Sequence, residues 1–241
     1  MVNTTIDLLV KKKLHLGHPT RDWNPKMSPY IYTKRKGFYI IDLLCTYPAL
    51  ECAKSALRDA ATKGSTFLFV GTKRQASVLV KHHAERCNSF YINHKWSGGL
   101  LTNWQTVSNM TRSLINASSG VVQKNSTKKS SFSSKKEAAR LEKQRQKLEK
   151  TVGGIRDMKK LPDIVIIIGA AEETNAVREC NKLGIPIVAI LDTNCDPRVA
   201  TWGVPGNDDS IASIDYILEE FSNAIISGLS TTFQSENQRK N

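Results

Sequence analysis

Short apolar runs alternate with amphipathic segments along most of the chain. The apolar runs lie at residues 38–44, 66–70, 90–92, 164–168 and 185–191. Apolar positions recur at helical spacing within residues 73–87, 172–183 and 209–228. Strands without a polar face are typical of a parallel sheet that helices cover on both faces. The pattern therefore predicts an α/β domain built from repeated strand–helix units.

Turn-forming and capping residues predict where several helices begin and end. Thr46 is a candidate N-cap for a helix after the first apolar run, Pro48 fits its first turn, and Gly64 ends it. Gly184 ends the helix at residues 172–183. An aspartate within residues 205–209 is predicted to cap the last helix.

Residues 105–151 contain no strand pattern and interrupt the alternation. Val107, Met110 and Leu114 are spaced as on one helix, and Ala138, Leu141 and Leu148 as on a second. The intervening residues 118–134 are rich in serine and lysine, a composition typical of a flexible tip. We expect a helical hairpin that projects from the sheet domain, with a thin apolar seam and a basic outer face.

Positive charge is concentrated in two segments of the chain. The formal net charge is +13, and residues 11–36 carry eight Lys or Arg against one acid. Residues 121–150 carry ten against three, whereas residues 161–241 carry five against twelve. Localised positive charge indicates a polyanionic partner. Aromatic residues stand between the cations of the first segment.

The cysteines and apolar runs bear on location. None of the five cysteines forms a C-x-x-C pair, which favours a reducing compartment. No run reaches 18 apolar residues, so no membrane span is expected. The first residues lack the pattern of a signal or transit peptide.

The sequence contains no recognisable set of catalytic residues. Residues 70–74 (VGTKR) follow a strand but lack the spacing of a triphosphate-binding loop, although a helix start there suits one phosphate. Asp192 follows a strand, where catalytic residues of open sheets lie, but it also suits a turn cap. His83 and Cys87 have metal-ligand spacing without a second pair, and a structural role is favoured. We predict no enzyme activity, no cofactor and no small-molecule substrate; a metal at His83 and Cys87 is not predicted but stays open.

A series of short motifs resembles one known family over nearly the whole chain. The motifs, in order, are LHLGH (14–18), WNPKM (23–27), IIDL (40–43), FVGTK (69–73), LTNW (101–104), GGI (153–155), LPD (161–163), NKLGIP (181–186), DTN (192–194) and PGNDD (205–209). Their order and spacing resemble the bacterial-type small-subunit ribosomal protein two family. Residues 33–37 (TKRKG), 178–180 (REC) and 192–197 (DTNCDP) look most like its plastid-encoded branch.

The resemblance implies a flavodoxin-like three-layer α/β fold with a projecting α-helical coiled-coil hairpin and no catalysis. It implies binding to small-subunit rRNA and neighbouring ribosomal proteins, including small-subunit ribosomal protein one. The expected location is the ribosome of the chloroplast stroma, or alternatively the cytoplasm of a cyanobacterium-like cell. We divide the chain into a basic arm (1–37), a first α/β part (38–104), the hairpin insertion (105–155), a second α/β part (156–229) and a tail (230–241).

The basic arm and a few loop residues are the predicted RNA contacts. Arg21 and Arg35 suit bidentate contacts to phosphate. For Trp23 we favour burial against the sheet domain over stacking on a base, and for Tyr30 both roles stay open. The acidic carboxy-terminal half is expected to face solvent or basic proteins. The predicted residues are Lys11, Lys12, Lys13, His18, Arg21, Trp23, Asn24, Lys26, Tyr30, Lys34, Arg35, Lys36, Lys73, Arg74, Lys95 and Asn103.

Overall fold

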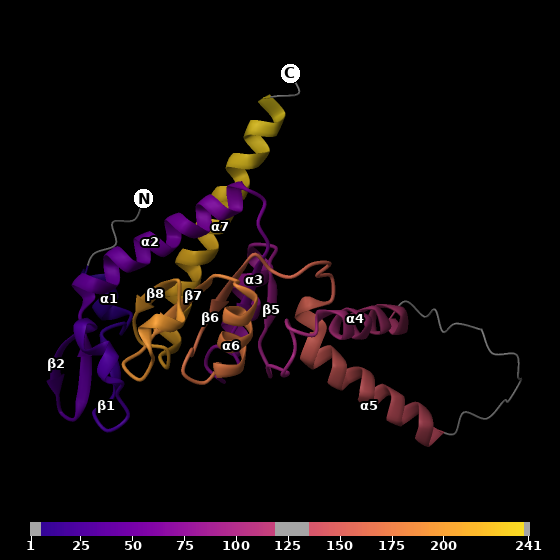
Figure 1. Cartoon of the computed structure of the whole chain (residues 1–241), viewed down its shortest axis with the longest axis horizontal. Coiled ribbons are helices and arrows are strands. Elements are labelled where there is room, and N and C mark those ends of the chain that lie inside the picture. The colour runs from indigo at the N-terminus through magenta and orange to yellow at the C-terminus, as the bar shows by residue number, and fades with distance from the viewer. Residues whose placement is uncertain (1–5, 119–134, 239–241) are drawn as a thin grey trace, which may run out of the picture.

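A five-stranded parallel sheet forms the centre of the molecule. The computed structural model describes residues 6–118 and 135–238, and Figure 1 shows the arrangement of its elements. The strands are paired in the order β5-β4-β6-β7-β8. This is the 2-1-3-4-5 order of flavodoxin-like folds. The strands are β4 (Phe67–Val70), β5 (Phe90–Ile92), β6 (Ile164–Ile167), β7 (Ile187–Leu191) and β8 (Trp202–Pro205).

Helices and loops cover both faces of this sheet, which confirms the predicted three-layer α/β class. One face packs against α1 (Ile6–Lys11), α2 (Leu43–Thr62), α3 (Ser77–Arg86) and α7 (Ile211–Gln238). The other packs against α6 (Thr174–Leu183), the loop at residues 96–101 and part of the amino-terminal segment. Successive residues of a strand enter opposite clusters, as Phe69 and Val70 do, because side chains alternate along a strand. The uniformly apolar strands follow from this double burial.

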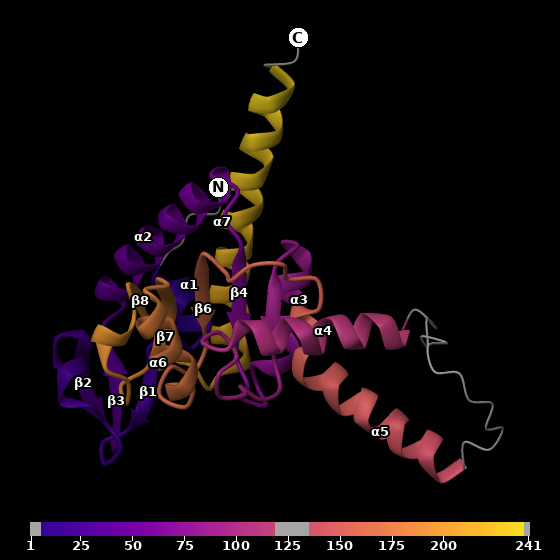
Figure 2. The same cartoon turned by 45° about the vertical axis from the view of Figure 1, so that its right-hand side comes forward.

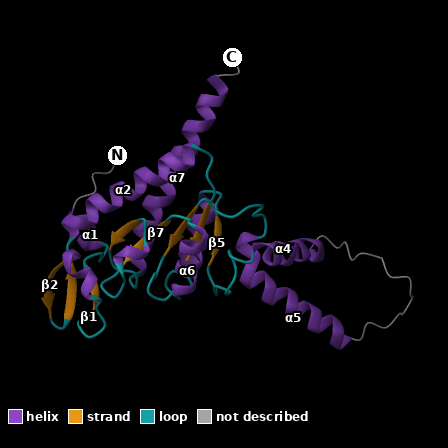
Figure 3. Ribbon diagram, in the orientation of Figure 1, coloured by secondary structure: helices purple, strands orange, loops and turns teal. Residues whose placement is uncertain are grey.

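A separate antiparallel sheet lies at one end of the molecule (Figure 3). It comprises β1 (Leu16–Pro19), β2 (Ile31–Arg35) and β3 (Phe38–Ile41), with β3 in the middle. The apolar run at residues 38–44 was expected to follow the pattern of the parallel strands, and that expectation is wrong. β3 instead pairs with β2 through a two-residue turn at residues 36 and 37, since a turn this short permits only antiparallel pairing. The predicted boundary between the arm and the α/β domain falls inside this turn.

Three helix ends differ from the sequence prediction. α2 begins at Leu43, because Asp42 caps it by accepting a hydrogen bond from Leu44 N at 2.9 Å, and Pro48 lies inside the helix. α3 begins at Ser77 rather than Lys73. α7 continues through Gly228 to Gln238, whereas Gly184 ends α6 in the left-handed conformation as predicted.

Two helices project from the domain, beside the edge strand β5. They are α4 (Trp104–Ser118) and α5 (Lys135–Val152). The two helices diverge from the domain outward in both Figure 1 and Figure 2. The predicted pair of helices is therefore present, but a coiled coil is not confirmed. The serine- and lysine-rich tip, from residue 119 to 134, lies outside the described residues. The described residues also form three 3₁₀ helices: η1 (Pro25–Tyr30), η2 (Gly153–Ile155) and η3 (Pro197–Val199). None of the described helices combines the length and apolarity needed to cross a bilayer.

Candidate nucleic-acid interface

The β2–β3 hairpin presents a cluster of cations on a defined turn. Lys36 and Gly37 connect the strands with φ values of 49° and 82°, and Arg35 pairs with Phe38. Two positive φ values in a two-residue loop are those of a type I′ turn, whose twist matches that of the strands. Lys34, Arg35 and Lys36 are all exposed at this tip. Within the described part of the chain, no carboxylate forms an ion pair with any of the three.

Two aromatic side chains accompany these cations on the hairpin. Tyr32 on β2 is 72% exposed, and Phe38 on β3 is 49% exposed. Neither was among the predicted contacts. Their exposure was not recognisable until residues 31–41 were known to form a hairpin, although their position beside TKRKG in the sequence was a signal.

The rest of the arm is fixed on the sheet domain by burial and backbone hydrogen bonds. Met27 in η1 is fully buried in the core cluster on the α6 side, and Tyr30 packs against the same cluster. Asn24 caps η1 by accepting from Lys26 N at 3.0 Å, and its own N–H donates to Thr193 O at 2.8 Å. Trp23 is half-buried, and its ring lies 5.0 Å from that of Tyr39 on β3. The burial favoured for Trp23 is therefore partial and lies against Tyr39 of the antiparallel sheet, whereas Met27 and Tyr30 pack on the main core.

Among the other predicted cations, Arg21 and Lys26 are exposed but have acidic partners, and Lys12 is half-buried near an aromatic ring. Arg21 Nε lies 3.2 Å from Asp22 Oδ2, and Lys26 Nζ lies 2.5 Å from Asp196 Oδ2. Lys12 Nζ lies 5.9 Å from the ring centroid of Tyr216. Lys11, Lys13 and Arg74 are exposed. Exposed pairs of this kind are weak, so these cations can exchange partners at little cost.

Lys95 and Asn103 flank a loop that an internal carboxylate holds in place. Glu179 of α6 accepts hydrogen bonds from Trp96 Nε1 at 2.9 Å and from three backbone N–H groups of the loop, at Gly99, Leu101 and Thr102. Burial would raise the pKa of Glu179, but the hydrogen bonds from Trp96 and the loop lower it overall. Lys95 and Asn103 are both exposed at the ends of this loop. The loop follows β5 in the chain, and β5 is the edge of the parallel sheet farther from the hairpin (Figure 1).

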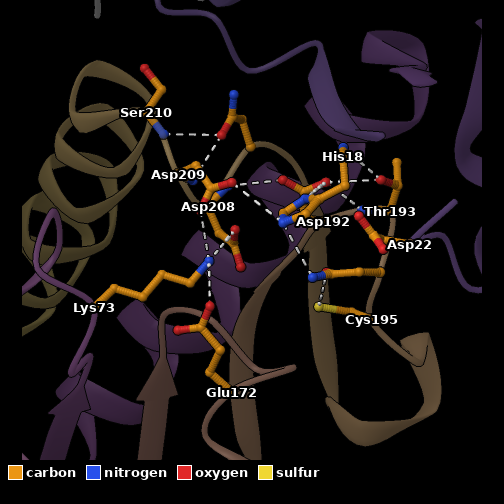
Figure 4. A network of polar contacts seen from close by, with 12 residues as sticks. His18, Asp22, Lys73, Glu172, Asp192, Thr193, Cys195, Asp208, Asp209 and Ser210 are labelled. Atoms are coloured by element: carbon orange, nitrogen blue, oxygen red, sulfur yellow. Dashed lines mark hydrogen bonds and ion pairs between the residues drawn. The ribbon is translucent and has the colours of Figure 1, made fainter. Parts of the chain in front are cut away.

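Lys73 does not belong to the exposed cations. Its side chain is buried, and Nζ lies 2.7 Å from Asp208 Oδ1, 2.9 Å from Asp209 Oδ1 and 3.4 Å from Glu172 Oε1. Burial alone would lower the pKa of Lys73, but the charges of Asp208 and Asp209 raise it overall. Figure 4 shows this network at the carboxyl edge of the sheet. The ammonium is committed to internal carboxylates, so we leave Lys73 out of the RNA surface proposed below.

His18 also faces inward, at the same edge of the sheet. Its Nδ1 lies 3.0 Å from Asp192 Oδ1 and its Nε2 lies 3.3 Å from Asp209 Oδ2. Interaction with Asp192 raises the pKa of His18 to about 9, against the opposing effect of burial. His18 N–H donates to Thr193 Oγ1 at 2.9 Å. The residue therefore joins β1 to the loop after β7, and we leave it out of the RNA surface as well.

Side chains of Lys73 and Glu173 lie at the crevice where flavodoxin-like folds bind ligands. The strand order reverses between β4 and β6, and such a switch point is the usual ligand site. Here Thr72 N, after β4, donates to Glu173 Oε1 at 3.0 Å. A Cβ on Gly169, after β6, would lie 2.9 Å from the side chain of Lys73. The backbone N–H of Thr72 and the space beside Gly169 are therefore both occupied by side chains at this point.

His83 and Cys87 have separate hydrogen-bond partners. His83 Nε2 lies 2.9 Å from Asp215 Oδ1, and the thiol of Cys87 donates to His83 O at 3.2 Å. Burial is the main cause that lowers the pKa of His83. The described residues do bring potential metal ligands together elsewhere: His18, Asp192, Asp208 and Asp209.

Comparison with known proteins identifies the family. The family described as "Ribosomal protein S2" matches residues 9–228. "Small ribosomal subunit protein uS2c" of Trieres chinensis is 46% identical over 232 residues, which cover 96% of this chain and 100% of that protein. "Small ribosomal subunit protein uS2c" of Oltmannsiellopsis viridis is 44% identical, over 99% of this chain and 98% of its own. The cyanobacterial "Small ribosomal subunit protein uS2" of Picosynechococcus sp. is 46% identical, over 91% of this chain and 84% of its own. Members of this family are structural rather than catalytic, and the chain belongs to the ribosomal protein S2 family.

Proposed function

We propose that this chain is a structural constituent of the small ribosomal subunit and binds small-subunit rRNA through its amino-terminal arm. The observation that carries the proposal is near-full-length identity with relatives named as small ribosomal subunit proteins. The cation-tipped hairpin supports the same function, because exposed cations on a fixed turn suit a phosphate backbone.

The proposed interface has a central and a peripheral part. Lys34, Arg35 and Lys36 are its centre, and each phosphate that they neutralise releases counterions. Tyr32 is the more exposed aromatic of the hairpin, and it stacks on an unpaired base. Trp23 and Tyr30 do not have this role. The peripheral residues are Lys11, Lys12, Lys13, Arg21, Lys26, Arg74, Lys95 and Asn103, while Trp23, Asn24 and Tyr30 hold the arm in position.

The partners and location follow from the family. We propose neighbouring small-subunit ribosomal proteins as partners, including small-subunit ribosomal protein one. The similarity to uS2c proteins of algae and to cyanobacterial uS2 supports a location in the ribosome of a chloroplast or of a cyanobacterial cytoplasm. Of these two, we propose the chloroplast stroma, on the resemblance of residues 33–37 to plastid-encoded members.

Binding of the full chain to small-subunit rRNA at several salt concentrations tests the proposal. The triple variant Lys34→Gln, Arg35→Gln, Lys36→Asn removes the tip charges, and asparagine before Gly37 still favours a type I′ turn. We expect weaker binding and a shallower salt dependence, with the slope reduced by about one unit for each phosphate that the variant no longer neutralises.

A charge-matched variant separates this site from general electrostatics. Arg58→Gln, Lys63→Gln, Lys81→Gln removes three exposed cations from α2, its C-terminal cap and α3. We expect this variant to keep most of the affinity and the wild-type slope. Equal decreases in affinity in the two triple variants would contradict a specific role for the hairpin.

Tyr32→Ala tests the stacking interaction separately. We expect binding to weaken by about 1–3 kcal/mol with an unchanged salt slope, because stacking releases no counterions. Unaltered affinity would remove Tyr32 from the interface without affecting the role of the cations.

A further inference from the structure

Four potential metal ligands from three separate segments meet at the carboxyl edge of the sheet. His18 comes from β1, Asp192 follows β7, and Asp208 and Asp209 follow β8. One ligand atom of each lies within 4.8 Å of the ligand atoms of the other three. Figure 4 shows these side chains pointing toward one another. An ion bound at about 2.0–2.2 Å to each atom needs opposing ligands at most about 4.4 Å apart, so a small contraction completes the site.

The cluster contains buried polar atoms that the protein itself does not satisfy. The Asp208 side chain is fully buried, and its Oδ1 accepts from Lys73, but its Oδ2 has no hydrogen-bond partner among the described residues. His18 Nδ1 is a second such atom of the cluster: it lies close to Asp192 Oδ1 but makes no hydrogen bond of good geometry. A buried carboxylate oxygen without a partner is costly, and native structures rarely leave one. The two atoms belong to the same cluster, which indicates a missing electropositive group.

The charges of the network also indicate a missing cation. The carboxylates of Glu172, Asp208 and Asp209 surround the ammonium of Lys73, and the carboxylate of Asp192 lies beside His18 in the same network. Even a protonated His18 leaves two more negative than positive charges among these groups. Lys73 bonds Asp208 through Oδ1 and leaves Oδ2 free to accept from another group. His18 must be neutral to bind a metal, so these groups then carry three more negative than positive charges, and a divalent cation between His18 and the three aspartates offsets two of them.

We propose that His18, Asp192, Asp208 and Asp209 bind one divalent cation of the Zn²⁺ or Mn²⁺ class. One imidazole nitrogen with three carboxylate oxygens suits these ions, whereas Mg²⁺ and Ca²⁺ prefer oxygen ligands alone. The ion joins β1 of the basic arm to the loops after β7 and β8. It thereby fixes the root of the arm, independently of what the arm binds.

Binding of Mn²⁺ to the full chain, stripped of metal and kept in reducing buffer, tests this site. Electron paramagnetic resonance measures free Mn²⁺ during a titration, and thiols compete poorly for this ion. We expect one tightly bound Mn²⁺ per chain, displaced by Zn²⁺ but not by excess Mg²⁺. Absence of binding to the folded chain, or displacement by Mg²⁺ at comparable concentration, would overturn the proposal.

Matched variants show whether the bound ion lies at this cluster. Asp208→Asn should abolish binding. Asp209 is half-exposed, so Asp209→Asn should disturb folding less than Asp208→Asn does. It should weaken Mn²⁺ binding roughly tenfold or more. Asp196→Asn alters a nearby carboxylate outside the cluster and should bind as the wild type does. Wild-type affinity in Asp209→Asn would place the ion elsewhere and overturn the assignment, even if Asp208→Asn failed to fold.

Hydrogen exchange provides a readout of the proposed role. The His18 amide donates to Thr193 Oγ1 across the junction between the arm and the sheet domain. We expect Mn²⁺ or Zn²⁺ to slow exchange at this amide in the wild type and not in Asp209→Asn. Unchanged exchange in the ion-bound wild type would contradict a role in fixing the arm.

Discussion

At the scale of single residues, Glu179 illustrates how one buried carboxylate organises a loop. Its two oxygens accept five hydrogen bonds from Trp96, Gly99, Leu101 and Thr102. The loop donors replace the water that the carboxylate loses on burial. The two adjacent glycines and the exposed Lys95 are therefore held in position by a residue more than seventy positions away in the sequence.

Glu179→Gln should destabilise the protein substantially. The amide nitrogen of glutamine cannot accept hydrogen bonds, so some loop N–H groups lose their partner. We expect the free energy of unfolding to fall by about 2–3 kcal/mol, measured by urea denaturation at pH 7. Glu219→Gln changes an exposed carboxylate of α7 and should have little effect.

The lowered pKa of Glu179 also predicts a pH dependence. The folded-state pKa lies below the unfolded value of about 4.3, so the stabilisation is complete above that value. It is lost as the pH falls through the folded-state pKa. The difference in stability between wild type and Glu179→Gln should therefore shrink on acidification below about pH 4.3. A difference that stayed constant on acidification to about pH 3 would contradict this account.

Gly37→Ala tests the turn that presents the cations. Gly37 has a φ of +82°, and a Cβ added there would meet no other atom within 4 Å. The substitution therefore destabilises the turn only through backbone strain. We expect hairpin stability to fall by about 1 kcal/mol, seen as faster amide exchange at Arg35 and Phe38. Gly98→Ala is the matched control, because Gly98 has open space and no positive φ. Equal effects in both variants would refute the type I′ assignment.

At the scale of elements, the apolar pattern predicted the central helices and four strands of the parallel sheet, but not β8. Doubly buried strands such as β6 and β7 stand out in sequence because every side chain is apolar. The antiparallel sheet could not be predicted in this way, because β2 is mostly exposed and has charged residues instead of an apolar pattern. Tyr32 was left out of the predicted RNA contacts for the same reason. The burial of Lys73 could not be predicted, because its carboxylate partners come from after β6 and β8, and only the topology brings them close.

Gly228 shows why one helix end could not be predicted. Glycine near the end of a helical pattern favours termination, yet α7 continues past it. A Cβ at Gly228 would lie 2.5 Å from Arg58 O and 2.6 Å from the Cβ of Ala61, both on α2. The glycine therefore permits the close crossing of α2 and α7 rather than ending the helix.

Gly228→Ala should separate these two helices. The added methyl group has no room, so we expect the free energy of unfolding, measured by chemical denaturation, to fall by about 1–3 kcal/mol. Ser227→Ala, on the exposed side of the same turn, should be nearly neutral. A stabilised Gly228→Ala variant would show that the helices can move apart at no cost.

At the scale of the whole molecule, opposite charges occupy different parts. The cation-tipped hairpin lies at one end and the α4–α5 pair at the other, with exposed lysines such as Lys143 and Lys147 on α5 (Figure 1). The internal carboxylates gather at the carboxyl edge of the sheet, where Lys73 and His18 face them. A surface arranged in this way suits a long, folded polyanion that touches the protein at more than one end.

The most direct test of the central claim is sedimentation of an extract from cells that express the protein, on sucrose gradients at increasing salt. We expect comigration with the small ribosomal subunit at low and moderate salt, and release at high salt, because the attachment is electrostatic. The triple hairpin variant should dissociate at lower salt than the wild type, and the charge-matched variant should not. Migration as a free protein at every salt concentration would contradict the proposed role.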